Sequence, residues 1–264
     1  MSLALVFAAS ALFAAPDTVD DFFTEFARRR ADIQTLRANY TEKTITPEET
    51  FESTGTLVYQ KPRRILRRTA PPENTVILID DQRCYQYEPE IKQVVIVDLQ
   101  HNPRANLLFL GFDNDIASLR EAYDVSVFSI EDQASGKKGI LIKPKAGDDE
   151  AWFKEVNIYL DDTDFLPYRI RMVNEDDSQV IIEVKDLRKN PALDPSETQA
   201  AVAEGTKVIL DEKVVETVGP GGKMIPEQGA SPAAASAPAE AEKPSGGEAP
   251  APTVSVSPLP PQGN

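Results

Sequence analysis

The chain has 264 residues, of which 28 are Lys or Arg and 43 are Asp or Glu, so its formal net charge at pH 7 is −15. This length is enough for one large all-β domain or two small ones. The acidic balance argues against nucleic acid as a partner, because contacts to phosphate require a cationic surface.

An apolar run, SLALVFAASALFAA, occupies residues 2–15, carries no charge and ends in small residues. Such a run is too short to span a bilayer and is typical of a signal-peptide core, although no Lys or Arg precedes it. A buried N-terminal helix is the alternative. We therefore predict that residues 1–15 are a signal peptide and that the mature protein is exported. The single Cys84 cannot form an intrachain disulfide, which fits this prediction.

The segment DTVDDFFTEFARRR, residues 17–30, predicts an amphipathic helix. Four apolar side chains fall at i, i+3, i+4 and i+7, and so on one helix face: Val19, Phe22, Phe23 and Phe26. Asp17 or Thr18 is placed to cap the N-terminus. Three aromatic rings on one face need a partner surface, and the sheet that follows is the only candidate.

Most of the chain up to residue 190 predicts short strands. The stretch 55–97 holds four or five runs rich in Val, Ile, Leu and Tyr, separated by KP, PPEN, DDQ and EPE. Breaks this short suit hairpins and exclude helical crossovers. Alternation predicts further strands at residues 36–46, 51–60, 123–130, 139–143, 152–160, 166–172 and 180–187.

Residues 103–121 interrupt the strand pattern. Leu107 and Leu108 belong to a short helical turn, and a second short helix is predicted through Ile116 and Leu119. Large apolar side chains on so short a helix exceed what a solvated loop carries. We expect this insertion to lie on a buried surface.

The C-terminal part differs in composition. From residue 191 onward the chain holds 12 of the 21 prolines and no Phe, Tyr or Trp. Residues 191–218 are predicted to form a short extension, with room for a helix after Asp194 and an edge strand at 207–210. Residues 219–264, rich in Pro, Ala, Gly, Ser and Glu, predict a disordered tail, because they cannot bury enough apolar surface to offset their ordering entropy.

No pattern of catalytic residues is found. The only histidine, His101, lies in a polar HNPR segment without a recognisable nucleophile or orienting partner. Clustered metal ligands and a glycine-rich phosphate loop are not apparent either. We expect neither an enzyme nor a cofactor, and no metal.

The predicted strands and helices carry an excess of apolar surface. The economical fold is mainly β: an open, strongly curved antiparallel half-barrel of about eleven strands over residues 16–190, with the N-terminal and inserted helices as a lid. The concave face and the lid then enclose an apolar cavity for a small ligand. An ordinary filled core is an equally open alternative.

Seven sequence pieces in order resemble the LolA family of periplasmic lipoprotein carriers. They are GTLVYQKP (55–62), VILIDDQ (76–82), YQYEPEIKQV (85–94), NLLFLGFDND (106–115), LREAYDV (119–125), VNIYLDD (156–162) and LPYRIRM (166–172). The resemblance runs from about residue 17 to 190. It implies an open antiparallel barrel with a helical lid, which agrees with the fold predicted from the residues.

The resemblance also implies a function. A member of this family takes lipoproteins from an inner-membrane ABC exporter, shields their acyl chains and delivers them to an acceptor at the outer membrane. The protein is then expected to be a periplasmic monomer that binds acyl chains or other lipids. The alternative is a lipid-sensing regulatory or scaffold protein of the cell envelope on the same fold.

Alternation and the resemblance together predict the site residues. Nine cavity residues follow from alternation: Tyr40, Leu57, Tyr59, Ile65, Val76, Leu78, Ile158, Ile170 and Met172. Four residues face the cavity from the lid: Phe22, Phe26, Leu107 and Leu108. A filled-core role stays open for each of them, and a one-residue slip would reverse a strand's faces.

Two cations near the cavity come from the comparison with the family. Lys61 stands where the family often has an inward Arg that tethers the lid, and Lys offers a point charge in place of a planar fork. Arg67 stands where the family often has an inward aromatic. Unpaired cations are costly to bury, so we expect one of them to bind an acidic side chain or a lipid head group.

Overall fold

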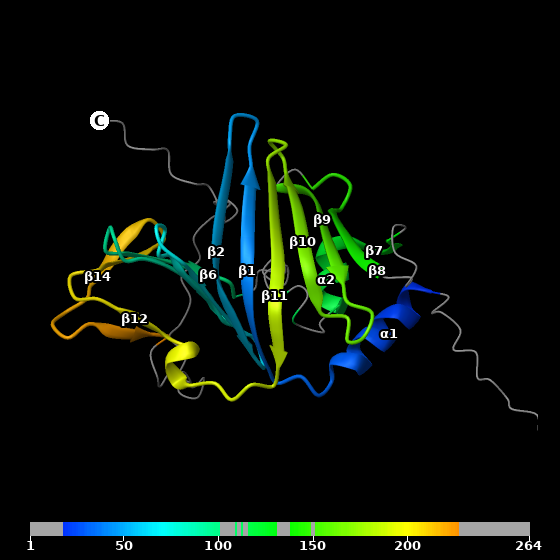
Figure 1. Cartoon of the computed structure of the whole chain (residues 1–264). Helices are drawn as coiled ribbons and strands as arrows, with labels where there is room; N and C mark the ends of the chain where they lie inside the picture. The colour runs from blue at the N-terminus through cyan, green and yellow to red at the C-terminus, as the bar shows by residue number, and fades with distance from the viewer. Residues whose placement is uncertain are drawn as a thin grey trace, which may run out of the picture.

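The structure is a computed structural model that describes residues 18–100, 109, 112, 116–130, 138–148 and 151–226. It is dominated by one 13-stranded sheet with the order β14-β13-β6-β5-β4-β3-β2-β1-β11-β10-β9-β8-β7 (Figure 1). The first eleven strands are β1 (Thr35–Ile45), β2 (Thr50–Gln60), β3 (Arg64–Thr69), β4 (Val76–Ile79), β5 (Arg83–Glu88), β6 (Gln93–Asp98), β7 (Tyr123–Ser129), β8 (Lys138–Pro144), β9 (Phe153–Leu160), β10 (Pro167–Asn174) and β11 (Gln179–Lys189).

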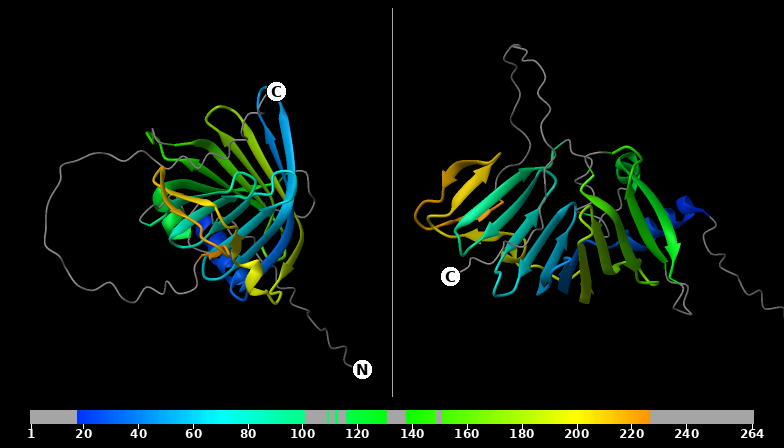
Figure 2. Two further views of the ribbon diagram at one scale, coloured as in Figure 1. Left: turned by 90° about the vertical axis from the view of Figure 1, so that its left-hand side faces the viewer. Right: turned by 90° about the horizontal axis from the view of Figure 1, so that it is seen from above.

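These eleven strands pair antiparallel throughout, and β1 lies between β2 and β11 at the middle of the sheet. The two halves of the meander therefore meet along β1. The outermost strands, β14 and β7, do not pair with each other, and the sheet is an open, curved wall (Figures 1 and 2). The predicted mainly β, curved and open antiparallel fold is confirmed.

Helix α1 (Val19–Arg30) follows the sequence prediction closely. The Thr18 hydroxyl accepts a hydrogen bond from the Asp21 backbone N–H at 3.1 Å, which caps the helix. The aromatic face is buried, with Phe22 and Phe26 each 1% exposed. Helix α1 and the short helix α2 (Ile116–Ala122) pack on the same end of the sheet, against β7–β10. No helix in the described ranges is long and apolar enough to cross a membrane.

We call the sheet face that α1 and α2 cover the inner face. One apolar cluster, the helix cluster, joins the two helices to β7–β10 and includes Ile140, Ile158 and Phe165. A second, the hairpin cluster, lies over β1–β5 and includes Leu36, Tyr59 and Phe112. Register places both on the inner face, because Ile158, Ile170 and Ile182 are direct cross-strand partners and link one cluster to the other.

The C-terminal segment folds back onto the opposite, outer face. A 3-10 turn at Pro195–Glu197 leads to a two-stranded sheet of β12 (Ala200–Val202) and β15 (Lys223–Ile225). The strand expected at 207–210 forms as β13 (Lys207–Leu210). It is not an edge strand as predicted, because it pairs parallel with β6 and antiparallel with β14 (Lys213–Thr217). Residues 223–225 were expected to belong to the disordered tail but form β15.

Candidate functional site

The inner face presents continuous rows of aliphatic side chains. Ile140, Ile158, Ile170 and Ile182 stand opposite one another across β8, β9, β10 and β11. A parallel row joins Val156, Met172 and Val180. Ile140 and Ile158 are fully buried, whereas Ile170, Met172 and Ile182 are only half-buried. The exposed aliphatic surface therefore lies near β10 and β11, between the helix cluster and the hairpin cluster.

Helix α1 is held on this face by aromatic packing. The Phe22 and Phe26 rings stack on Phe165, with ring centroids 5.2 and 6.3 Å away. The Arg29 guanidinium carbon also lies over the Phe165 ring, 4.3 Å from its centroid. Burial of three phenylalanines represents about 5–9 kcal/mol. The two predicted lid residues Phe22 and Phe26 thus serve as packed core in this state of the protein.

Lys61 contacts the end of α1, as the resemblance implies for a tether. Its Nζ donates a hydrogen bond to the carbonyl oxygen of Ala31, the C-cap residue, at 3.2 Å. Carbonyl groups at a helix C-terminus carry partial negative charge and attract a cation there. The contact is a single, partly exposed hydrogen bond, so it is weaker than the aromatic packing of the helix.

Arg67 introduces a charge into the inner face. One guanidinium nitrogen donates to the Glu42 carboxylate at 2.5 Å, and the guanidinium carbon lies 4.6 Å from the centroid of the Tyr40 ring. Burial lowers the pKa of Arg67, but the charge of Glu42 and the contacts with Tyr40 outweigh it and raise the pKa above its usual value. The expectation of an acidic partner for this cation is met by Glu42. Among the residues that the structure describes, the buried Arg67 Nε has no hydrogen-bond partner.

Tyr40 completes this polar group. Its hydroxyl lies 2.9 Å from the Thr69 hydroxyl, and its ring packs over Gly55, where an added Cβ would lie only 2.7 Å from ring atoms. Glycine at position 55 is therefore required for the ring to lie flat against β2. Tyr40, Leu57, Tyr59 and Ile65 all belong to the hairpin cluster, on the predicted face.

The prediction that Val76 and Leu78 line this face is wrong. Leu78 pairs with Leu66, and Val76 pairs with Arg68, so both point to the outer face. Instead Ile77 and Ile79 point inward. All four residues of β4 are apolar, so alternation could not tell which of them point inward. The C-terminal segment that covers the outer face of β4 was not predicted either.

The outer face of β4 belongs to a third group of buried residues, the outer cluster. Val76 and Leu78 pack there with residues of the C-terminal segment such as Ala200, Val208 and Ile225. The segment is also tied down by polar contacts. Arg68 donates to the carbonyl oxygens of Ser196 and Gln199, at 2.9 and 2.7 Å.

Sequence reasoning missed two aromatic residues of the insertion. Phe109 and Phe112 are 1% and 7% exposed in the hairpin cluster, and Phe112 stacks on Tyr59 at 5.8 Å. The Arg63 guanidinium lies over the Phe109 ring at 4.3 Å. The run LLFLGF that contains them was a visible signal. The lid residues predicted there, Leu107 and Leu108, lie outside the described residues, as does His101.

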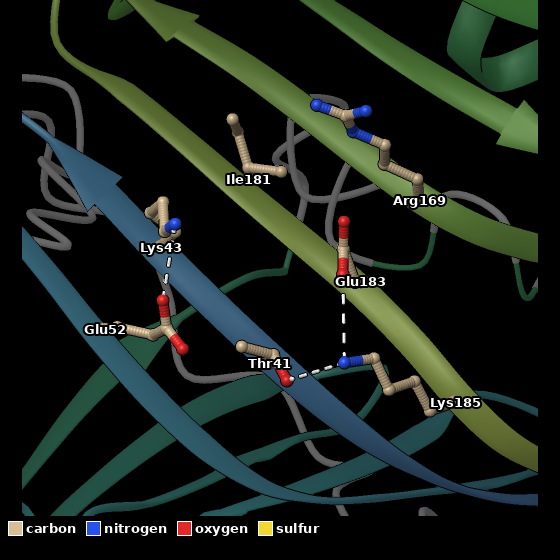
Figure 3. Close-up of a pocket in the computed structure, with 7 residues that line it drawn as sticks. All are labelled: Thr41, Lys43, Glu52, Arg169, Ile181, Glu183 and Lys185. Atoms are coloured by element: carbon tan, nitrogen blue, oxygen red, sulfur yellow. Dashed lines mark hydrogen bonds and ion pairs between the residues drawn. The ribbon is translucent and has the colours of Figure 1, made fainter.

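The outer face carries a shallow cavity of about 250 Å³ between β1, β2, β10 and β11 (Figure 3). It is lined by Thr41, Lys43, Glu52, Arg169, Ile181, Glu183 and Lys185. Its charges are largely paired, with Lys43 to Glu52 at 3.3 Å and Lys185 to Glu183 at 3.8 Å. A charged lining is unsuited to an acyl chain. The inner face is therefore the candidate site for an apolar ligand.

The sheet is open and curved, and its apolar inner face lies beside two helices, an arrangement that suits an apolar ligand. The family described as outer membrane lipoprotein carrier protein LolA matches residues 31–199, and the chain belongs to this family. The match includes β1–β11 and leaves out α1 and β12–β15.

Relatives at low identity carry the same description. The chain is 26% identical over 210 residues to the outer-membrane lipoprotein carrier protein of Bordetella pertussis, covering 77% of this chain and 93% of that protein. It is 25% identical to the carrier protein of Bordetella avium, covering 68% and 82%. A solved LolA superfamily protein from Nitrosomonas europaea aligns with a TM-score of 0.37 at 12% identity, covering 66% and 96%.

Proposed function

We propose that the protein is a periplasmic carrier that shields the acyl chains of lipoproteins on its inner face and delivers them to the outer membrane. Family membership and the names of its relatives, which are outer-membrane lipoprotein carrier proteins, support this proposal. The observation that carries it is the half-buried aliphatic surface of Ile170, Met172 and Ile182 beside two helices on the same face. The donor would be an inner-membrane ABC exporter, and the acceptor an outer-membrane protein.

The energetics require a cover that opens. Burial of one methylene is worth about 0.8 kcal/mol, so a chain of about fifteen methylenes represents roughly 12 kcal/mol gross. A ligand held this tightly leaves only if the occupied state costs the protein something. Displacing α1 from its aromatic contacts would supply a cost of similar order, about 5–9 kcal/mol for its three phenylalanines. A net of about 3–7 kcal/mol would then favour binding, a weaker hold from which a better site can take the ligand.

The test uses two neighbouring isoleucines of β11. Ile182 points to the inner face and Ile181 to the outer face, and both are half-buried. The mature protein should bind a hydrophobic fluorophore, and I182D should weaken that binding at least about tenfold, because a carboxylate in the wall is costly to desolvate. I181D is the matched control and should bind the fluorophore normally.

The carrier activity needs a second measurement. The mature protein, added to spheroplasts, should release lipoproteins into the medium, and I182D should not. Mass spectrometry of the purified protein should detect a co-purified lipid. Equal fluorophore binding by I182D, I181D and the parent chain would contradict the site. Normal binding without any release of lipoprotein would contradict the carrier and favour a lipid-sensing regulator with a stable protein partner.

A further inference from the structure

Strand β14 forms an open edge of the main sheet. In the described part of the chain it pairs only with β13, and the sheet ends there. All five of its residues are exposed, and Val214 and Val215 are 56% and 57% exposed. Its outward backbone N–H and C=O groups are therefore available for pairing with another strand.

The usual protection of such an edge is weak here. Proteins protect edge strands with proline, with charged side chains or with a covering segment. Strand β14, KVVET, contains no proline, and one of its two charges, Glu216, is paired with Lys223 of β15. The edge with its two exposed valines is a surface that favours an uncharged, extended strand.

The sequence after the last described residue contains one segment of this kind. After Pro226 the sequence has three β-branched residues, Thr253, Val254 and Val256. They lie together in TVSVS, residues 253–257, between Pro252 and Pro258. This segment has five residues, as β14 has, carries no charge and alternates Val with Ser or Thr. Residues 227–252 contain no Val, Ile, Thr or aromatic residue, so strand propensity is concentrated at 253–257.

The chain is long enough to bring the two together. Strand β15 ends at Ile225, and its first residue, Lys223, contacts Glu216 of β14. The 26 residues from 227 to 252 can span up to about 85–95 Å when extended, at roughly 3.3–3.6 Å per residue. Pairing within one chain also benefits from an effective concentration in the millimolar range.

A second copy of the chain is a less favourable occupant. Two five-residue strands meet over only about 17 Å, which cannot bury the roughly 1,000 Å² of a stable protein interface. The net charge of −15 further opposes self-association. We propose that residues 253–257 of the same chain add as a further strand to the open edge of β14. This inference is independent of lipid binding.

Hydrogen exchange of the β14 amides tests the proposal in the full chain. Substitution of Val254→Pro and Val256→Pro removes two backbone donors from the added strand, and the matched control places prolines at Ala233 and Ala235. The double proline variant at 254 and 256 should speed exchange of the outward-facing amides of Lys213–Thr217 about tenfold, while the control should not. Amides of β1–β11 should exchange at the parent rate in both, because the proposed strand pairs only with β14.

Three results decide the matter. A synthetic peptide of residues 251–259 should restore slow exchange to the variant, which supports the proposal. Equal β14 exchange in the parent chain, the variant and the control would overturn it. Protection in the parent chain that rises with protein concentration would also overturn it, because the occupant would then be a second copy.

Discussion

The ion pair between Arg67 and Glu42 allows a quantitative test of the inner wall. The two side chains are only 19% and 11% exposed, and their contact is 2.5 Å long. Removing one partner of a buried pair leaves an uncompensated charge and typically costs 3–5 kcal/mol, about what we expect for R67M. Replacing both partners removes the charge from the wall, so R67M/E42Q should cost less than R67M alone, by about 2 kcal/mol.

The assay is urea unfolding of the parent chain, R67M, E42Q and the double variant, analysed as a double-mutant cycle. The double variant should also bind a hydrophobic fluorophore more tightly than the parent chain, because the wall has become less polar. A coupling free energy below about 0.5 kcal/mol would refute the reasoning, since it would show that the pair is screened by solvent.

Three further predictions rest on single groups. Phe26→Ala should lower the free energy of unfolding in urea by about 3–5 kcal/mol, because loss of the 1%-exposed ring leaves a cavity beside Phe165. T24A, on the exposed face of α1, is the control and should have little effect on urea unfolding. Burial raises the pKa of the Cys84 thiol to about 11, so the folded protein should resist thiol reagents at pH 8 and react only on unfolding; rapid labelling would contradict this. Hydrogen bonds from Arg28 and Arg29 lower the pKa of Glu25 from 4.5 to about 2. The ionised Glu25 therefore stabilises α1 above pH 4.5, and this stabilisation is lost as the pH falls toward 2. A carboxyl NMR titration of Glu25 with a midpoint near 4.5 would refute this prediction.

Local structure was predictable because its causes are local. The helix of residues 19–30 follows from apolar spacing and a Thr cap, and the strands follow from alternating runs broken by turn residues. The placement of Ile158, Ile170 and Met172 on one face followed from the same alternation, which held because most of their neighbours on those strands are polar. For β4 the neighbours are also apolar, and the assignment of Val76 and Leu78 failed for that reason.

The tertiary structure alone decided which groups meet. The carboxylate that neutralises Arg67 lies 25 residues earlier, on β1, and only the pairing of β1, β2 and β3 brings it within reach. Residues 191–218 were predicted to form only a short extension and residues 219–226 part of a disordered tail, yet residues 200–226 pack on the apolar outer face of β3–β6. Sequence patterns determine most of the elements, and their faces where apolar and polar residues alternate, because those depend on neighbours a few residues apart. The segment that packs on each face lies far away in the sequence. Only the folded chain shows which distant segments meet, because local patterns carry no information about such contacts.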